Sequence, residues 1–229
     1  MIRMEAVSKT YRPGGTPALS ELDLQIGRGE FVFLVGPSGA GKTTLIKLIS
    51  REEMPTVGRI EFLENDTAAY REPELLQHRR RMGLVFQDYR LLKSKTISEN
   101  VALALEVVGR PPREIRERVP AALARVGLTG KENSFPDELS GGEQQRAGIA
   151  RAIVREPLLI LADEPTGNVD RKTARGLMEL FETINGDGTT VIIATHAWDL
   201  VDRLKKRVIT LEKGRITGDE EQGSYGDVH

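Results

Sequence analysis

The pattern of apolar and polar positions predicts short strands that alternate with helices along most of the chain. Runs that are mostly apolar, typical of strands buried on both faces, lie at residues 31–35, 82–86, 158–162 and 190–194. Residues 22–26 alternate apolar and polar side chains, and residues 2–7 predict a further short strand. This alternation of strands and helices favours an α/β domain built on a parallel core sheet.

Shorter elements complete the expected domain. Turn residues at 55–58 precede a strand at 59–62, and a charged helix is expected at 72–81. Asp170 can cap a helix that runs to about residue 184. The remaining expected elements are a short helix at 198–203 and strands at 207–211 and 215–216.

The stretch from about residue 91 to 157 has a different character. Helix formers dominate it and strand signals are nearly absent, with helices expected at 98–108, 113–126 and 142–155. We interpret this stretch as a helical subdomain inserted into an α/β core formed by about residues 1–90 and 158–217. Residues 218–229 are polar and acidic and are expected to form a mobile tail.

Composition narrows the class of protein. The 229 residues have a net charge of −1, which gives no basic excess for nucleic acid, and they include no cysteine for disulfides or thiolate metal sites. Neither a signal-peptide core nor an apolar run of the ~20 residues needed to span a membrane is present. The sequence therefore predicts a soluble cytoplasmic protein that could still dock on a membrane protein.

A glycine-rich segment after the run at 31–35 carries the strongest chemical signal. A strand, this turn and a following helix form the context that a phosphate-binding loop requires, since the glycines let backbone N–H groups point inward at a phosphate. Lys42 can reach the β- and γ-phosphates, and the Thr43 hydroxyl can ligate Mg²⁺. The nucleotide-binding residues expected here are Gly36, Pro37, Ser38, Gly39, Ala40, Gly41, Lys42, Thr43 and Thr44.

Two adjacent carboxylates end the apolar run at 158–162. Open α/β sheets bind ligands at the carboxyl ends of their strands, and charges there are costly unless they have a task. We expect Asp163 to hold the Mg²⁺ of Thr43 and Glu164 to act on the attacking water, as general base or as its orienter.

The segment Ser140-Gly141-Gly142-Glu143 opens another expected helix. Its hydroxyl and two glycines allow a second anion site at the helix N-terminus. An equally acceptable interpretation is a helix start with Ser140 as N-cap and no ligand. The residues alone leave both interpretations open.

Leu139 to Arg146 resembles the signature motif of ABC-type ATPases, and the upstream loop and downstream carboxylates match that family in order and spacing over nearly the whole chain. The resemblance implies a P-loop ABC nucleotide-binding domain with a parallel core sheet, a small antiparallel β part and a helical subdomain. It implies hydrolysis of ATP with Mg²⁺. Further residues take their roles from it: Tyr11 stacks on adenine, Gln87 touches Mg²⁺, Asp170 is the acid of a loop that crosses to the other subunit, and His196 meets the γ-phosphate. Val169 replaces the usual leucine, and Ala197 stands where aspartate is common.

The family also implies a homodimer that forms head to tail around ATP. In it, Ser140, Gly141, Gly142 and Glu143 of one chain would close the ATP held by Lys42 of the other, and catalysis would depend on Glu164, His196 and Lys42. Residues 87–92 and the start of the helical stretch would contact a separate integral membrane subunit. Tyr89, Leu91 and Leu92 could supply apolar surface to it, or could pack internally.

Within the family, the segments 86–92, 135–146 and 161–168 resemble the ATPases of bacterial cell division. That branch implies an FtsX-like membrane partner, control of a cell-wall hydrolase, and a peripheral position on the inner face of the membrane at the division site. The segments are shared in part with ATPases of lipoprotein release and MacB-type export, which remain the alternative. A soluble ABC protein acting on DNA or ribosomes is disfavoured by the lack of long insertions, and a GTPase by the lack of an Asn-Lys-x-Asp motif.

Overall fold

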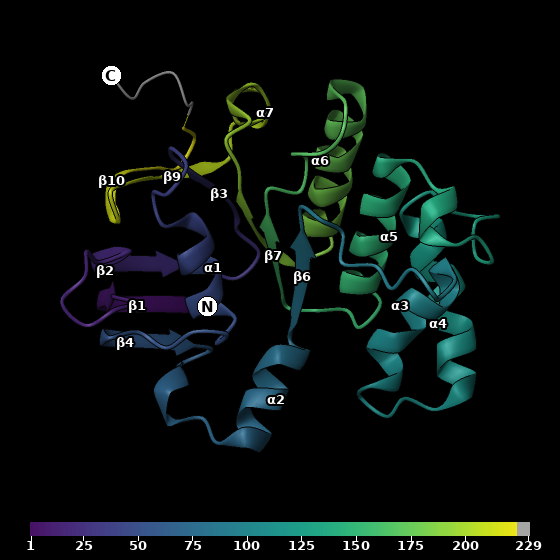
Figure 1. Ribbon diagram of the computed structural model, residues 1–229, viewed down its shortest axis with the longest axis horizontal. Helices are drawn as coiled ribbons and strands as arrows, with labels where there is room; N and C mark the ends of the chain where they lie inside the picture. The colour runs from purple at the N-terminus through teal and green to yellow at the C-terminus, as the bar shows by residue number, and fades with distance from the viewer. Residues whose placement is uncertain (224–229) are drawn as a thin grey trace.

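The computed structural model describes residues 1–223 and arranges them around two sheets (Figure 1). The first is antiparallel, in the order β2-β1-β4-β5, and the second is six-stranded, in the order β10-β9-β3-β8-β7-β6. Within the second sheet, β9, β3, β8, β7 and β6 run parallel and β10 pairs antiparallel with β9. The strands are β1 (Ile2–Lys9), β2 (Leu19–Ile26), β3 (Phe31–Val35), β4 (Val57–Phe62), β5 (Asn65–Asp66), β6 (Met82–Phe86), β7 (Leu159–Asp163), β8 (Thr190–Ala194), β9 (Arg207–Glu212) and β10 (Arg215–Glu220). The predicted α/β fold with a parallel core is confirmed.

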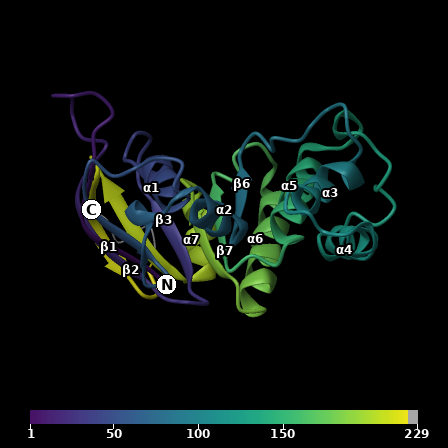
Figure 2. The same cartoon turned by 90° about the horizontal axis from the view of Figure 1, so that it is seen from below.

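Helices cover both faces of the parallel sheet. α1 lies between the two sheets, and α6 packs on the opposite side, followed by the group α3, α4 and α5 (Figures 1 and 2). The bounds are α1 (Lys42–Ile49), α2 (Glu72–Arg80), α3 (Ile97–Glu106), α4 (Pro112–Arg125), α5 (Gly141–Ile153), α6 (Arg171–Gly186) and α7 (Trp198–Leu204), with short 3-10 turns at Thr67–Ala69 and Pro136–Glu138.

Strand β3 is buried on both faces, and this explains its unbroken apolar run. Phe31, Phe33 and Val35 pack into a cluster with α3, α5 and α6. Val32 and Leu34 point the other way, into a cluster formed with α1 and the antiparallel sheet. Because alternate residues of a strand face opposite sides, one strand serves two cores.

The observed elements differ from the expected ones mainly in where individual strands begin and end. Val57 and Gly58, expected in a turn, begin β4, and β2 starts three residues earlier than predicted. The polar tail was expected from Gly218, but β10 continues to Glu220. The reason is a long-range ion pair, because the guanidinium of Arg207 donates to both carboxylate oxygens of Asp219 at 2.7 and 2.8 Å. The rest of the predicted tail, residues 224–229, lies outside the described residues.

Candidate active site

The carboxyl ends of four parallel strands meet at one cleft of about 590 Å³. β3 leads into the glycine-rich loop and β8 leads to His196. β7 ends at Asp163, which Glu164 follows, and Gln87 directly follows the end of β6. The cleft is lined by Ala18, Ser38, Gly39, Ala40, Gly41, Lys42, Thr43, Thr44, Gln87, Asp163, Glu164 and His196. The sheet order therefore brings together residues that are up to 178 positions apart, from Ala18 to His196.

The glycine-rich loop wraps around the buried ammonium group of Lys42. Lys42 Nζ donates to the carbonyl oxygens of Gly36 at 2.7 Å and Pro37 at 3.2 Å. Gly41 sits at the N-cap of α1 with φ 108°, a left-handed conformation that disfavours other residues. A Cβ at Gly36 would collide with the carbonyl oxygen of Leu211 on β9, so this position also has to be glycine. The loop thus places the first turn of α1 directly against the cleft.

Glu164 lies close to both of the other expected catalytic groups, Lys42 and His196. Its Oε1 lies 2.9 Å from His196 Nδ1 and 4.0 Å from Lys42 Nζ, and its Oε2 accepts the backbone N–H of His196 at 3.3 Å. Glu164 has a left-handed backbone, φ 49°, and its N–H donates to the carbonyl of Ala194 at 2.8 Å. The Glu164 side chain is 16% exposed, whereas that of His196 is 67% exposed. A half-enclosed carboxylate between a lysine and a histidine suits proton transfer or orientation of a water.

Asp163 is the carboxylate that burial affects most. Burial raises the pKa of Asp163 above its usual value, with a smaller contribution from Glu164. The hydroxyl of Thr43 and the charges of Lys42 and Lys47 oppose this rise in the pKa. Thr43 and Asp163 both line the cleft, and their joint role as ligands of one ion stays a prediction.

The donor atoms at the cleft fit Mg²⁺. Thr43 offers a hydroxyl, Asp163 a carboxylate and Gln87 an amide oxygen, and oxygen ligands are what this ion prefers. Residues 1–223 contain no group of three or more His, Cys, Asp or Glu side chains that could hold a metal by themselves. The donor set is thus incomplete without further oxygens, such as those of a nucleotide phosphate.

Asn168 contacts Gln87, the residue that follows β6, and the sequence analysis assigned no separate role to Asn168. Gln87 Nε2 donates to Asn168 Oδ1 at 3.3 Å, and Asn168 Nδ2 donates to the Gln87 carbonyl at 3.0 Å. The only signal in the sequence was its place in the loop between Glu164 and Asp170.

The segment after Gln87 is held by α5. Tyr89 and Arg90 both have left-handed backbones, with φ 57° and 48°. Arg151 donates to the carbonyl of Arg90 at 2.6 Å and to that of Tyr89 at 2.9 Å. The Tyr89 hydroxyl donates to the Asn168 carbonyl at 3.4 Å. Tyr89 is half-buried, Leu91 packs against the core and Leu92 is 42% exposed, so Leu92 is the exposed one of the three side chains expected to offer apolar surface.

Tyr11 lies beside the loop helix at the margin of the cleft. Its hydroxyl is 3.4 Å from Thr44 Oγ1, the Lys9 ammonium is 5.0 Å from the ring centroid, and the residue is 51% exposed. An exposed aromatic ring next to the loop is available for stacking.

The segment from Ser140 to Glu143 lies in a different hollow, of about 680 Å³, together with Asp170. Ser140 caps α5 by accepting the backbone N–H of Glu143 at 3.3 Å, and Glu143 Oε2 accepts the N–H and the hydroxyl of Ser140 at 2.9 and 2.8 Å. These hydrogen bonds lower the pKa of Glu143, and Lys131, 3.1 Å away, contributes in the same direction. Gly142 is close to Thr173 of α6, where a Cβ would collide. The structure thus does not join this segment to the phosphate-loop cleft within one chain.

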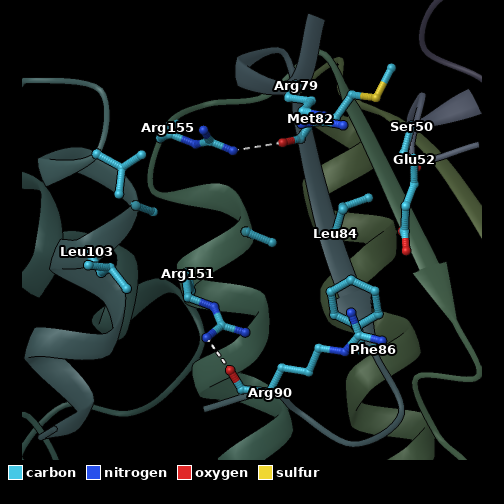
Figure 3. Close-up of a pocket in the computed structure, with 13 residues that line it drawn as sticks. Ser50, Glu52, Arg79, Met82, Leu84, Phe86, Arg90, Leu103, Arg151 and Arg155 are labelled. Carbon is cyan, nitrogen blue, oxygen red and sulfur yellow. Dashed lines mark hydrogen bonds between the residues drawn. The ribbon is translucent and has the colours of Figure 1, made fainter. Parts of the chain in front are cut away.

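A third hollow, of about 640 Å³, separates the sheet edge from the helical stretch (Figure 3). β6 supplies the apolar side chains of Met82, Leu84 and Phe86, and α3 faces them with Leu103 and Ala104. Charged side chains surround this apolar floor, namely Glu52, Arg79, Arg90, Arg151 and Arg155. Arg90 stacks on the ring of Phe86, 3.6 Å from its centroid. Within the described residues, no helix has the length and apolar character to cross a membrane.

Comparison with known proteins decides the family. The family model described as "ABC transporter" matches residues 19–167. The chain belongs to the ABC transporter family. Similar curated proteins named "Cell division ATP-binding protein FtsE" come from Mycobacterium tuberculosis (49% identity, 99% of this chain and 98% of the relative), Bacillus subtilis (51%, 99% and 99%) and Escherichia coli (47%, 95% and 98%).

Solved structures agree with this assignment. The dimeric structure of a post-hydrolysis state of the ATP-binding cassette MJ0796 bound to ADP and Pi has a TM-score of 0.88 and 36% identity, covering 98% of this chain and 100% of that chain. The structure of cbiO1 from Clostridium perfringens has a TM-score of 0.89 and 30% identity, covering 96% and 88%. The ABC ATPase fold is confirmed, and as a member of this family the chain is an ATP hydrolase.

Proposed function

We propose that this ABC ATPase is the ATP-binding subunit of a cell-division complex, and that it drives a membrane partner of the FtsX type. The observation that carries the proposal is the similarity of 46–51% identity to FtsE proteins over 95–99% of this chain. Such similarity over whole chains covers every segment discussed above, including the contacts outside the ATP cleft.

The cleft supports the following chemistry. Lys42 and the N–H groups at the start of α1 bind the phosphates, and Thr43, Asp163 and Gln87 would hold Mg²⁺. When bound, that ion supplies positive charge to the phosphate oxygens. Glu164 accepts a proton or a hydrogen bond from the attacking water, and its Oε1 lies 4.0 Å from Lys42 Nζ. His196 bonds Glu164 through Nδ1, which leaves Nε2 for the γ-phosphate.

A head-to-tail homodimer would complete the site. The signature residues Ser140, Gly142 and Glu143 line a hollow together with Asp170, and this hollow is separate from the phosphate loop. A second copy can bring that hollow to the ATP held by the first. Charge-assisted hydrogen bonds formed only with the γ-phosphate present, each worth ~1.5–3 kcal/mol, would make ATP the switch for closure.

The hollow of Figure 3 is the surface that we assign to the membrane partner. Its floor on β6 is apolar, and four arginines against one glutamate surround it: Arg79, Arg90, Arg151, Arg155 and Glu52. An amphipathic helix with acidic residues beside its apolar face fits this surface. The chain itself would then lie on the inner face of the membrane, and closure of the dimer would move a partner that controls a cell-wall hydrolase.

Depletion in the bacterium that carries the gene tests the cellular role. We expect failed septation or chaining, rescued by the intact gene and not by a Glu164→Gln variant. The matched experiment is co-purification with the product of the neighbouring reading frame, expected to be a four-span membrane protein with a large external loop. Normal division together with a defect in lipoprotein release or drug sensitivity would instead support the alternative of an extraction or export ATPase.

A further inference from the structure

Asn168 holds both the backbone and the side chain of Gln87. Its Nδ2 donates to the Gln87 carbonyl at 3.0 Å, while its Oδ1 accepts from Gln87 Nε2 at 3.3 Å. The strands that carry the two loops are neighbours, because β6 and β7 pair with Phe86 opposite Asp163. One amide thus closes a small ring of hydrogen bonds with another.

The hydrogen-bonding rules of this ring fix the orientation of both amides. The backbone carbonyl of Gln87 can only accept, so Asn168 has to present its NH₂ group to it. The Oδ1 of Asn168 can also only accept, so Gln87 has to present Nε2 in turn. Gln87 Oε1 is then the amide atom that has no hydrogen-bond partner among residues 1–223.

We propose that Asn168 is a positioning residue, which orients the Gln87 amide so that its oxygen is the atom offered to Mg²⁺ and the nucleotide. This inference rests on the proposed role of Gln87 as a metal contact. Gln87 lines the cleft together with Thr43 and Asp163, and an oxygen, not an NH₂ group, is the ligand that Mg²⁺ accepts. A flipped amide would present two N–H donors to the cation and repel it.

Two residues next to Gln87 and Asn168 support the interpretation that their contact is specific. A Cβ at Gly167 would lie 2.8 Å from Gln87 Nε2, so the absence of a side chain there makes room for the glutamine amide. The hydroxyl of Tyr89 donates to the backbone carbonyl of Asn168 at 3.4 Å and ties the same residue to the segment after Gln87. Asn168 therefore contacts this segment at three points.

The test compares Asn168→Ala, Gln87→Ala and the double variant in the full chain. The measured quantities are the Mg²⁺ concentration for half-maximal ATP hydrolysis and the affinity for a fluorescent ATP analogue, with Mg²⁺ and with EDTA. We expect Asn168→Ala to raise the half-maximal Mg²⁺ concentration by about twofold to tenfold, the equivalent of one lost hydrogen bond. Affinity in EDTA and the melting temperature should stay unchanged. Asn65→Ala is the control, because that amide bonds only the local carbonyl of Leu63.

The double variant separates orientation from a general structural effect. If Asn168 acts through Gln87, removing it changes nothing further in the Gln87→Ala background. The inference would be overturned if Asn168→Ala raised the half-maximal Mg²⁺ concentration equally in the wild-type and Gln87→Ala backgrounds. It would also be overturned if Asn168→Ala weakened the affinity for the ATP analogue in EDTA. If Gln87→Ala itself leaves the Mg²⁺ dependence unchanged, the proposed metal contact fails. If Gln87→Ala shifts it and Asn168→Ala does not, only the positioning role fails.

Discussion

Helices α1 and α5 both have a glycine at their N-terminal end, Gly41 as the N-cap of α1 and Gly141 as the first residue of α5, and both ends face a hollow. The two ends differ in how their free backbone N–H groups are satisfied. α1 has Gly41 at its N-cap, with no side-chain hydrogen bond to that end and no acidic residue in its first turn. α5 has a complete capping box, in which Ser140 and Glu143 satisfy each other's backbone N–H groups. An anion can therefore approach α1 directly, whereas at α5 it has to compete with a carboxylate.

Because of this difference, we expect a nucleotide phosphate to bind at the two helix ends in a fixed order. The α1 end carries its own cation, Lys42, and can hold a phosphate within a single chain. At the α5 end the capping box already satisfies the N–H groups of Ser140 and Glu143 and places a carboxylate there, so we expect this end to gain from a phosphate only when another surface has bound and placed it. We infer that the loop is the primary nucleotide site and that the capped helix acts second.

The largest expected effect comes from Glu164→Gln, which leaves both helix ends intact. Removal of the acting carboxylate should lower turnover by about 10²- to 10⁴-fold, while ATP affinity is retained. Light scattering with ATP should then show a mass twice that of the nucleotide-free chain. Glu117→Gln, on the exposed face of α4, is the control. A monomeric mass with ATP, or normal turnover, would contradict the assignment.

The next effect distinguishes the two ends directly. Lys42→Ala should weaken ATP binding by about 10²-fold, because charge-assisted hydrogen bonds to phosphate are lost. Ser140→Asp keeps a capping side chain but adds a negative charge, so it should leave ATP affinity of the monomer unchanged. Introduced into the Glu164→Gln chain, it should prevent the ATP-dependent dimer. The order of binding is wrong if Ser140→Asp weakens the monomer's ATP affinity as much as Lys42→Ala does.

Asp163→Asn should separate activity from stability. Because burial raises the pKa of Asp163, folding disfavours its charged form, and the wild-type chain loses stability as the pH rises from the ordinary carboxyl pKa of 3.8 through the raised value. At neutral pH the neutral asparagine avoids this loss. We expect a melting temperature equal to or above that of the wild type, a gap that closes toward pH 3.8, and turnover reduced to background. A variant that melts lower at neutral pH would show that Asp163 stabilises the fold.

The smallest expected effect concerns the cap of α5. Ser140→Ala should lower the free energy of unfolding by about 1 kcal/mol, and Ser140→Asn should restore it, as measured by urea denaturation. Glu143, whose pKa is lowered by its hydrogen bonds with Ser140, contributes stability above its ordinary carboxyl pKa of 4.5, and this contribution is lost as the pH falls through the lowered value. Equal stability of Ser140→Ala and the wild type would mean that the cap is energetically silent.

The fold was largely predictable because its strands and helix starts are local signals. The run at 31–35 and the cap at Asp170 each identified an element, and β8 was predicted with its observed bounds. The ends of β4 and β10 were not predictable in the same way. Gly58 and Asp219 are poor strand residues, and they are held in strands by pairing with β1 and β9 and by Arg207.

Apart from Ala18, the residues that line the cleft stand in motifs that the sequence shows, but their contacts with one another were not predictable. Lys42, Glu164 and His196 stand in separate motifs. Only the order of β3, β8 and β7 places Lys42 Nζ and His196 Nδ1 within 4.0 Å of Glu164 Oε1. Arg151 could not be connected to Tyr89 and Arg90 from the sequence, since 61 and 62 positions separate them. The same limit applies to Asn168, whose partner lies 81 positions away.

Strand β3 has a consequence for how the whole molecule melts. Its alternate residues belong to two hydrophobic clusters, so neither cluster can lose its packing while the strand remains ordered. The chain should therefore unfold as one cooperative unit, in which the antiparallel sheet and the helical stretch depend on each other through β3 and through β7, β8 and β9, which also contribute to both clusters. Lost packing or a cavity in either cluster would therefore loosen β3, and with it the phosphate loop that follows this strand.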